Sequence, residues 1–301
     1  MSLRLLAGAC LALALLAGDP LWAAAPLTVV DGEGRTVTLD GPPRRIVSLA
    51  PHITEVVFDL GAGDRLVGTV RFSDWPPEAK DVPRVGDAWS ASVETIVALK
   101  PDLVLAWADG GLGRPVAQIE ALGIPVYFDV TKTLDQIAQS QVRLGTLLGA
   151  SETGATRARA TRARLAELRA TAPDDGPRAF FQIADQNLYT VSGAHFIGEA
   201  LTLCGASNIF DAQPLAVPTV GVETVVAANP ELIVISRPLG VEHTWESKWL
   251  DYPSVAAVRF GQIKVINADL ISRPGTRLID GVARLCEMIG STDGALRANR
   301  H

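Results

Sequence analysis

The sequence has few charges and few reactive residue types. Of its 301 residues, 20% are charged and 6% are aromatic, and it holds four histidines and three cysteines. The formal net charge is −6, and no cluster of Lys and Arg forms a basic stripe that would bind a phosphate backbone. These shortages exclude a nucleic-acid-binding function, whereas the 48% of hydrophobic residues predicts a globular chain long enough for two domains.

The sequence also lacks the short motifs of common enzyme classes. It contains no GxSxG, no HExxH, no GxxxxGK followed by Ser or Thr, and no GxGxxG after a strand. None of the histidines lies at ligand spacing from another histidine or a cysteine; they are His52, His195, His243 and His301. We therefore expect no catalytic centre, no metal site and no cofactor.

Only one long apolar run is present, from Leu5 to Ala17, and it is shorter than the roughly 20 residues that span a bilayer. Arg4 precedes this run and the small residues Ala23, Ala24 and Ala25 follow it. That order is typical of a secretory signal peptide. We predict that residues 1–25 are removed by cleavage near Ala25 and that the rest of the chain is exported.

Two cysteines, Cys204 and Cys286, remain once the predicted signal peptide and its Cys10 are removed. Thiols in an oxidising compartment pair, so we expect a disulfide between them. Such a bond would close a long loop and stabilise the fold by roughly 4 kcal/mol in the chain-entropy model. Two buried free thiols are the alternative.

From Arg44 onward, short runs of β-branched residues alternate with helical patterns. This alternation predicts an α/β fold with largely parallel sheets covered by helices on both faces. Residues 151–172 differ, because Ala, Arg, Glu and Leu dominate there, which predicts one exposed helix of about 20 residues. We therefore predict an N-terminal α/β lobe over residues 26–149, an interlobe helix over 150–174 and a C-terminal α/β lobe over 175–301.

An internal repeat supports two related lobes. Residues 92–105 read SVETIVALKPDLVL, and residues 221–234 read GVETVVAANPELIV. Each copy predicts a helix that begins near a glutamate, ends at a proline and is followed by a strand. Glu94 and Glu223 occupy the same place in the two copies. A helix dipole alone explains a glutamate there, but equivalent acids on two lobes also suit a two-fold symmetric partner.

Several aromatic residues fall in loops or just beyond strands: Phe72, Trp75, Trp89 and Trp107. Ligands of α/β sheets bind outside the carboxyl ends of the strands, which is where Trp107 is expected. Aromatic residues gathered at one end of a lobe suit a large, flat, apolar ligand. The alternative is that each of them only packs against the core.

Five segments carry a resemblance to a known family: residues 45–55, 60–68, 73–79, 98–104 and 273–278. Over about residues 44–289 the chain resembles the substrate-binding proteins of ABC importers that carry cobalamin, haem and ferric siderophores. The resemblance implies a class III periplasmic binding protein fold, a periplasmic location, a monomer and a membrane permease dimer as partner. It also implies a protein that captures a ligand and is not an enzyme.

Within that family the chain is most similar to the corrinoid-binding members, because of SDWPP at residues 73–77, Trp107 after LVLA, and the two cysteines. The resemblance implies that cobalamin is the ligand and that Glu94 and Glu223 pair with arginines of the permease. The sequence differs from these members at Val217 and Leu270, where the resemblance leads us to expect aromatic residues. The residues that it places in the ligand cleft are Trp75, Trp89, Trp107, Tyr189, Asp269 and Arg273.

Three other functions stay open at this point. A haem-binding member of the family usually supplies a Tyr or His ligand to iron, for which His52 and Tyr189 are the candidates. A siderophore-binding member usually has more basic side chains in its cleft. An exported α/β hydrolase or metal-dependent enzyme is the third alternative, although the motifs of both are absent.

Overall fold

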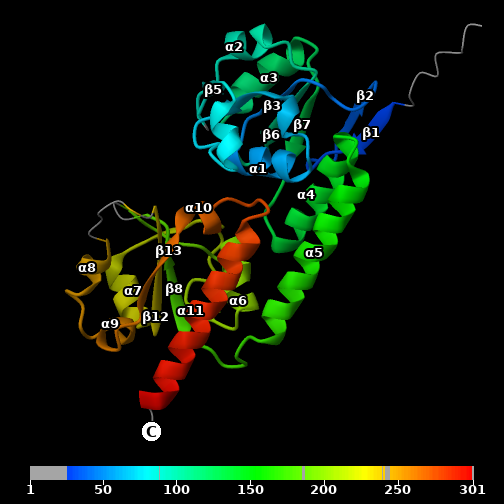
Figure 1. Ribbon diagram of the computed structural model, residues 1–301. Helices are drawn as coiled ribbons and strands as arrows, with labels where there is room; N and C mark the ends of the chain where they lie inside the picture. The colour runs from blue at the N-terminus through cyan, green and yellow to red at the C-terminus, as the bar shows by residue number, and fades with distance from the viewer. Residues whose placement is uncertain (1–25, 88, 185–186, 239, 241–244, 300–301) are drawn as a thin grey trace, which may run out of the picture.

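The computed structural model describes residues 26–87, 89–184, 187–238, 240 and 245–299, which form two α/β lobes one beyond the other (Figure 1). The predicted signal peptide, His243 and His301 lie outside the described residues. Within the described part of the chain, no helix is both long and apolar enough to cross a membrane. The two-lobed α/β fold predicted from the alternation of strands and helices is confirmed.

The first lobe has a five-stranded parallel sheet in the order β5-β4-β3-β6-β7. Its side chains alternate between the two faces, as strand geometry requires: Ile46 and Leu105 join one core cluster, and Val47 and Val104 join the other. Both faces are therefore buried, as parallel sheets require. The strands are β3 (Ile46–Ser48), β4 (Leu66–Val70), β5 (Arg84–Gly86), β6 (Leu103–Trp107) and β7 (Val126–Asp129).

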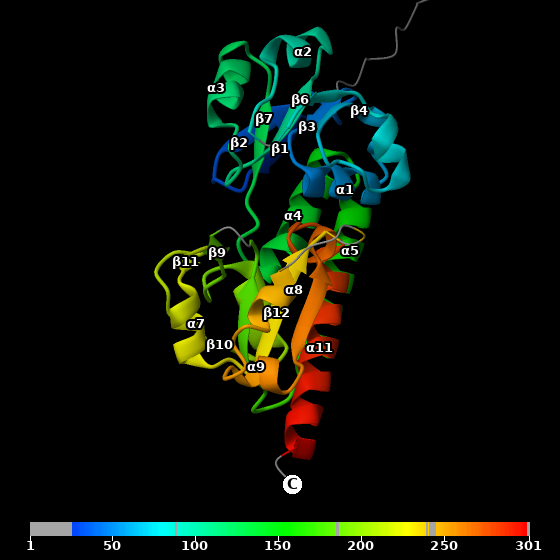
Figure 2. The same ribbon diagram turned by 90° about the vertical axis from the view of Figure 1, so that its left-hand side faces the viewer.

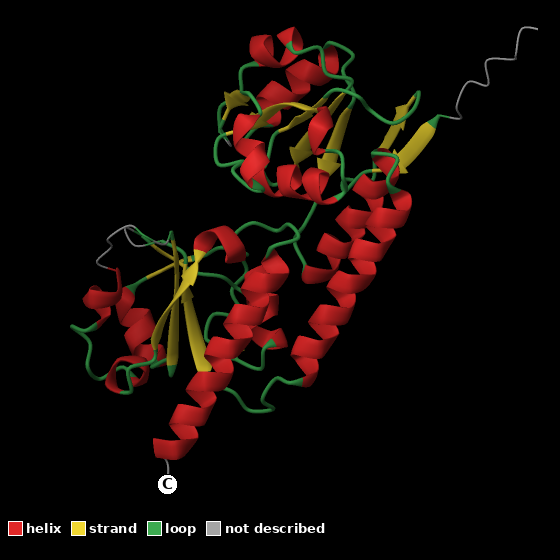
Figure 3. Ribbon diagram, in the orientation of Figure 1, coloured by secondary structure: helices red, strands yellow, loops and turns green. Residues whose placement is uncertain are grey.

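Helices cover both faces of this sheet (Figure 3). Helix α1 (Pro51–Asp59) packs on one face, and α2 (Val93–Ala98) and α3 (Gly113–Ala121) pack on the other. A hairpin of β1 (Leu27–Val30) and β2 (Thr36–Leu39) adds to the α1 side. The two short 3₁₀ helices are η1 (Gly63–Arg65) and η2 (Pro77–Asp81).

The second lobe has a four-stranded parallel sheet in the order β10-β8-β12-β13, and a separate antiparallel pair, β9 with β11. The strands are β8 (Arg178–Gln182), β9 (Leu188–Tyr189), β10 (Ser207–Asn208), β11 (Thr219–Val220), β12 (Leu232–Arg237) and β13 (Ile263–Asn267). The helices are α6 (Phe196–Leu203), α7 (Val222–Ala228), α8 (Trp245–Trp249), α9 (Ala256–Arg259), α10 (Ala268–Ile271) and α11 (Leu278–Asn299). Helices α6 and α11 cover one face, and α7, α8 and α9 cover the other.

Two helices packed side by side, α4 (Leu134–Leu147) and α5 (Ser151–Ala170), run between the lobes (Figures 1 and 2). Helix α5 confirms the long helix predicted over residues 151–172. Leu134 and Ile137 of α4 lie in the core of the second lobe, whereas Leu144 of the same helix lies in the core of the first. Gly154 allows the close packing, because a Cβ there would collide with the carbonyl oxygen of Gln141. The domain boundaries expected from the sequence stay a prediction.

The C-terminal helix α11 continues beyond Ile289 as far as Asn299. Two side chains explain the extension: Leu296 is buried, and buried Thr292 donates from Oγ1 to Oε1 of Gln262 at 3.0 Å. Cys286 of α11 forms a disulfide with Cys204, at the end of α6, which confirms the predicted bond.

Candidate functional site

The two lobes meet through residues that follow the carboxyl ends of strands. Glu55 and Asp74 come after β3 and β4 of the first lobe, and Asp269 and Arg273 come after β13 of the second. Arg273 joins them, since it donates to Oδ1 of Asp74 at 2.9 Å, to Oδ1 of Asp269 at 2.7 Å and to Oε1 of Glu55 at 3.3 Å. The carboxyl ends of parallel strands are the usual place for a ligand in such folds. This interlobe face is therefore the candidate site.

The electrostatics of Arg273 follow from its surroundings. Burial on its own would lower the pKa of its guanidinium, but the hydrogen bond that it donates to Asp74 and the charges of Asp269, Asp74 and Glu55 together raise it. The group thus keeps its charge while its side chain is only 13% exposed. A shielded cation of this kind can donate to a neutral oxygen of a ligand, because its own charge is already compensated.

Trp75 lies at the same place. The guanidinium carbon of Arg277 is 4.7 Å from the centroid of its ring, which is a cation–π contact between the two lobes. The Trp75 side chain is still 45% exposed and offers apolar surface to a ligand. The structure thus brings together three of the residues expected in the ligand cleft, Trp75, Asp269 and Arg273.

Trp107 ends strand β6 and packs edge-on against His52, with 5.2 Å between ring centroids. Its indole Nε1 is buried and, among the described residues, has no hydrogen-bond partner. His52 in turn lies against the interlobe segment, since a Cβ added to Gly275 would be 3.1 Å from its carbonyl oxygen. Trp107 is therefore connected to the interlobe face through His52 rather than placed directly in it.

His52 points into the first lobe. Its Nε2 is 4.0 Å from Oδ2 of Asp129, and both side chains are almost fully buried. Burial, and then the charge of Arg273, lower the pKa of His52 to about 3. Burial raises the pKa of Asp129 to about 6, and the nearby Ser140 hydroxyl and the charge of Arg143 offset this rise only in part. At neutral pH the imidazole is neutral and the carboxylate is ionised, so the two do not form an ion pair.

Trp89 and Tyr189 are exposed, at 79% and 39%. The hydrogen bonds, ion pairs and ring contacts of the described residues do not connect either of them to Arg273. Phe72, which the predicted set of cleft residues lacks, is 62% exposed three residues before Trp75 and has a φ of 67°. A bulky residue with positive φ is unusual and often marks a functional position. Its place in an aromatic loop beside SDWPP is the signal that could have added it.

Glu94 and Glu223 lie apart from this face. Both are exposed residues in the first turns of α2 and α7, which belong to the outer layers of the two lobes, away from α4 and α5 (Figures 1 and 2). Each helix leads into a central strand, β6 or β12, as the repeat predicts. The two copies differ at the cap, because Ser92 accepts from the amide of Thr95 while Gly221 has no capping side chain.

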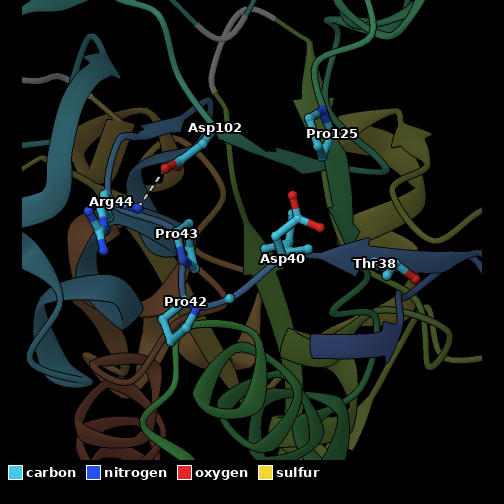
Figure 4. Close-up of a pocket in the computed structure, with 9 residues that line it drawn as sticks. Thr38, Asp40, Pro42, Pro43, Arg44, Asp102 and Pro125 are labelled. Atoms are coloured by element: carbon cyan, nitrogen blue, oxygen red, sulfur yellow. Dashed lines mark hydrogen bonds between the residues drawn. The ribbon is translucent and has the colours of Figure 1, made fainter. Parts of the chain in front are cut away.

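Figure 4 shows a pocket of about 590 Å³ in the first lobe, between the end of β2 and the residues that precede β3, β6 and β7. It lies at the amino ends of these strands, opposite to the end where ligands of α/β sheets bind. Its Asp102 already accepts from the backbone amides of Arg44 and Arg45 at 2.8 and 2.9 Å. None of the residues expected in the ligand cleft lines it, so this pocket is not the candidate site.

Comparison with known proteins gives consistent matches over most of the chain. A family model described as periplasmic binding protein matches residues 46–270. The vitamin B12-binding protein of Vibrio cholerae serotype O1 is 36% identical over 247 residues, which are 81% of this chain and 88% of the relative. The vitamin B12-binding protein of Pectobacterium carotovorum is 33% identical over 250 residues, 82% of this chain and 88% of the relative.

Solved structures show the same architecture. The periplasmic vitamin B12 binding protein BtuF of Vibrio cholerae superposes with a TM-score of 0.76 at 34% identity, over 83% of this chain and 98% of the other. A periplasmic haem-binding protein from Pseudomonas aeruginosa superposes with a TM-score of 0.72 at 26% identity, over 82% of this chain and 92% of the other. The similarity therefore includes proteins with different ligands on one fold.

Proposed function

Because this chain belongs to the periplasmic binding protein family, we propose that it captures cobalamin or a related corrinoid between its lobes and delivers it to an ABC importer. It is a binding protein and not an enzyme, and the corrinoid is its cargo rather than a resident cofactor. The similarity to vitamin B12-binding proteins at 36% identity supports this ligand over others in the family.

The single observation that carries the proposal is the cluster around Arg273 and Trp75 between the lobes. A corrinoid has a flat ring and a fringe of amide groups. Trp75 would cover one face of that ring, while Arg273 and Asp269 would hydrogen-bond to the amides. Both polar residues are needed, because an amide is at once a donor and an acceptor.

Haem is the alternative that the structural relatives keep open, but His52 supports it poorly. The Nε2 of His52 faces Asp129 inside the first lobe, and the side chain is 4% exposed. Tyr189 is the other candidate for an iron ligand, and it lies on the short strand β9. A ferric siderophore would favour uncompensated basic groups, whereas Arg273 and Arg277 both pair with carboxylates.

We also propose that Glu94 and Glu223 dock the protein on the two equivalent halves of a permease dimer. Their exposure, their equivalent places in the internal repeat and their distance from the Arg273 cluster in the fold support this role. Charge pairing at such a surface governs encounter and register. The protein would act as a monomer in the periplasm, after loss of the signal peptide near Ala25.

Binding of purified protein to cyanocobalamin, haemin and a ferric hydroxamate siderophore, each measured by calorimetry, tests the ligand. We expect cyanocobalamin to bind most tightly. Variants Trp89→Ala and Trp107→Ala test the rest of the cleft: each should weaken corrinoid binding by about tenfold or more if its ring contacts the ligand. Tighter binding of haemin than of cyanocobalamin would refute the assignment.

A further inference from the structure

The interlobe face contains a buried carboxylate, Glu55, which is not among the residues expected to bind the ligand. Helix α1 presents two acids four residues apart, Glu55 and Asp59, to the second-lobe segment 273–277. The Glu55 side chain is 2% exposed, while the Asp74 and Asp269 side chains beside it are 44% and 49% exposed. Glu55 is thus the only one of these three carboxylates that solvent does not reach appreciably.

Glu55 binds two arginines of the other lobe at once. Arg277 donates from Nε to Oε2 at 2.8 Å and from Nη2 to Oε1 at 2.5 Å, a bidentate pair. Arg273 donates from Nη1 to Oε1 at 3.3 Å. Charge-assisted bonds of this kind are stronger than neutral ones, and a buried carboxylate holds its partners in one geometry.

The three acids around Arg273 differ in how readily a ligand can replace them. Asp74 and Asp269 are half-exposed, so water or a ligand oxygen can take over their hydrogen bonds at small cost. Glu55 is not open to water in this way, and its bidentate pair with Arg277 fixes its buried carboxylate beside the guanidinium of Arg273. It therefore keeps the guanidinium of Arg273 in place when the other two contacts change.

The same carboxylate also fixes the aromatic side of the site. Arg277, held by Glu55, lies 4.7 Å from the Trp75 ring centroid. One buried side chain thus sets the position of a hydrogen-bonding group and of the cation that packs on an aromatic ring. From this geometry, and given the proposed corrinoid function, we infer that Glu55 is a positioning residue, which holds Arg273 and Arg277 for ligand binding without touching the ligand.

The variant Glu55→Gln tests the inference, because it keeps the size of the side chain and replaces one acceptor oxygen with a donor. We expect its affinity for cyanocobalamin to fall by about tenfold. If Glu55 acts through Arg273, the same substitution in an Arg273→Ala background should change affinity by less than about threefold. The matched control is Asp59→Asn, which lies one turn further along α1 and contacts Thr276 and Arg157; its affinity should stay at the wild-type value.

A readout without ligand separates this inference from the proposed function. The Nε–H of Arg277 should exchange slowly with solvent in the wild type and in Asp59→Asn, and fast in Glu55→Gln, as measured by ¹⁵N NMR. If Glu55→Gln does not fold, Glu55→Asp, which withdraws the carboxylate by one methylene, should give the same changes to a smaller degree.

Several results would overturn the inference: unchanged cyanocobalamin affinity in Glu55→Gln, an equal loss in the Arg273→Ala background, or unchanged Nε–H exchange. A wild-type protein that binds haemin but not cyanocobalamin would refute the proposed ligand only. The exchange experiment and the haemin affinity of the same variants would then decide the role of Glu55.

Discussion

His52 and Asp129 are buried side by side, and we expect their titrations to change the stability of the fold in opposite directions as the pH falls. The folded-state pKa of His52, about 3, lies below the ordinary value of 6.5, because burial disfavours the imidazolium. As the pH falls below 6.5, the unfolded chain takes up a proton that the folded protein does not. His52 therefore stabilises the fold above pH 6.5, and this contribution is lost at about 1.4 kcal/mol per pH unit as the pH falls toward 3.

The contribution of Asp129 to stability changes with pH in the opposite direction. Its folded-state pKa, about 6, lies above the ordinary value of 3.8, because burial disfavours the carboxylate. Between these two values the folded protein takes up the proton first, so lowering the pH relieves the cost of a buried charge and raises stability. Over the range from about pH 6 to about pH 4 each group contributes about 2 kcal/mol of change, and the two changes nearly cancel in the wild type.

Two single variants separate the contributions. In His52→Gln only Asp129 titrates, so stability relative to the wild type should rise as the pH falls from 6 to 4. In Asp129→Asn only His52 titrates, so relative stability should fall over the same range. Urea unfolding followed by far-UV circular dichroism should show the two variants diverging by about 4 kcal/mol across this window. The reasoning is refuted if both variants keep the pH dependence of the wild type.

Three further predictions concern the ligand, the disulfide and the partner. Trp75→Ala should weaken cyanocobalamin binding by about tenfold to a hundredfold in calorimetry, and an unchanged affinity would remove Trp75 from the site. The double variant Cys204→Ala with Cys286→Ala removes the disulfide, whose two cysteines are 82 residues apart in the chain. Its free energy of unfolding should be lower by about 4 kcal/mol, and its ligand affinity should not change. Urea titrations of the two forms measure this, and equal stability would contradict it. Glu94→Arg with Glu223→Arg should bind cyanocobalamin like the wild type and yet abolish its uptake into cells. Normal uptake would show that the two glutamates only stabilise their helices through the helix dipole.

Much of the fold could be predicted from the sequence because its signals are local. The spacing of apolar residues gave the strands and helices, and the composition of residues 151–172 gave α5. The disulfide followed from the cysteine count and the expected compartment. The approach of Trp75 to Asp269 and Arg273 was expected from the resemblance alone, because no local pattern brings a residue of the first lobe next to residues of the second.

Only the tertiary structure decided what lies between the lobes. Glu55 and Arg277 are 222 residues apart, and their bidentate pair exists because α1 and the start of α11 meet across the interlobe face. The orientation of His52 is of the same kind: the structure places it in the first turn of α1, and the packing of Trp107 and Gly275 around it leaves its Nε2 facing Asp129. Periodicity and capping act over a few residues and determine which elements form. The partners of a buried charge depend on how those elements pack, and so they are determined only when the whole chain is folded.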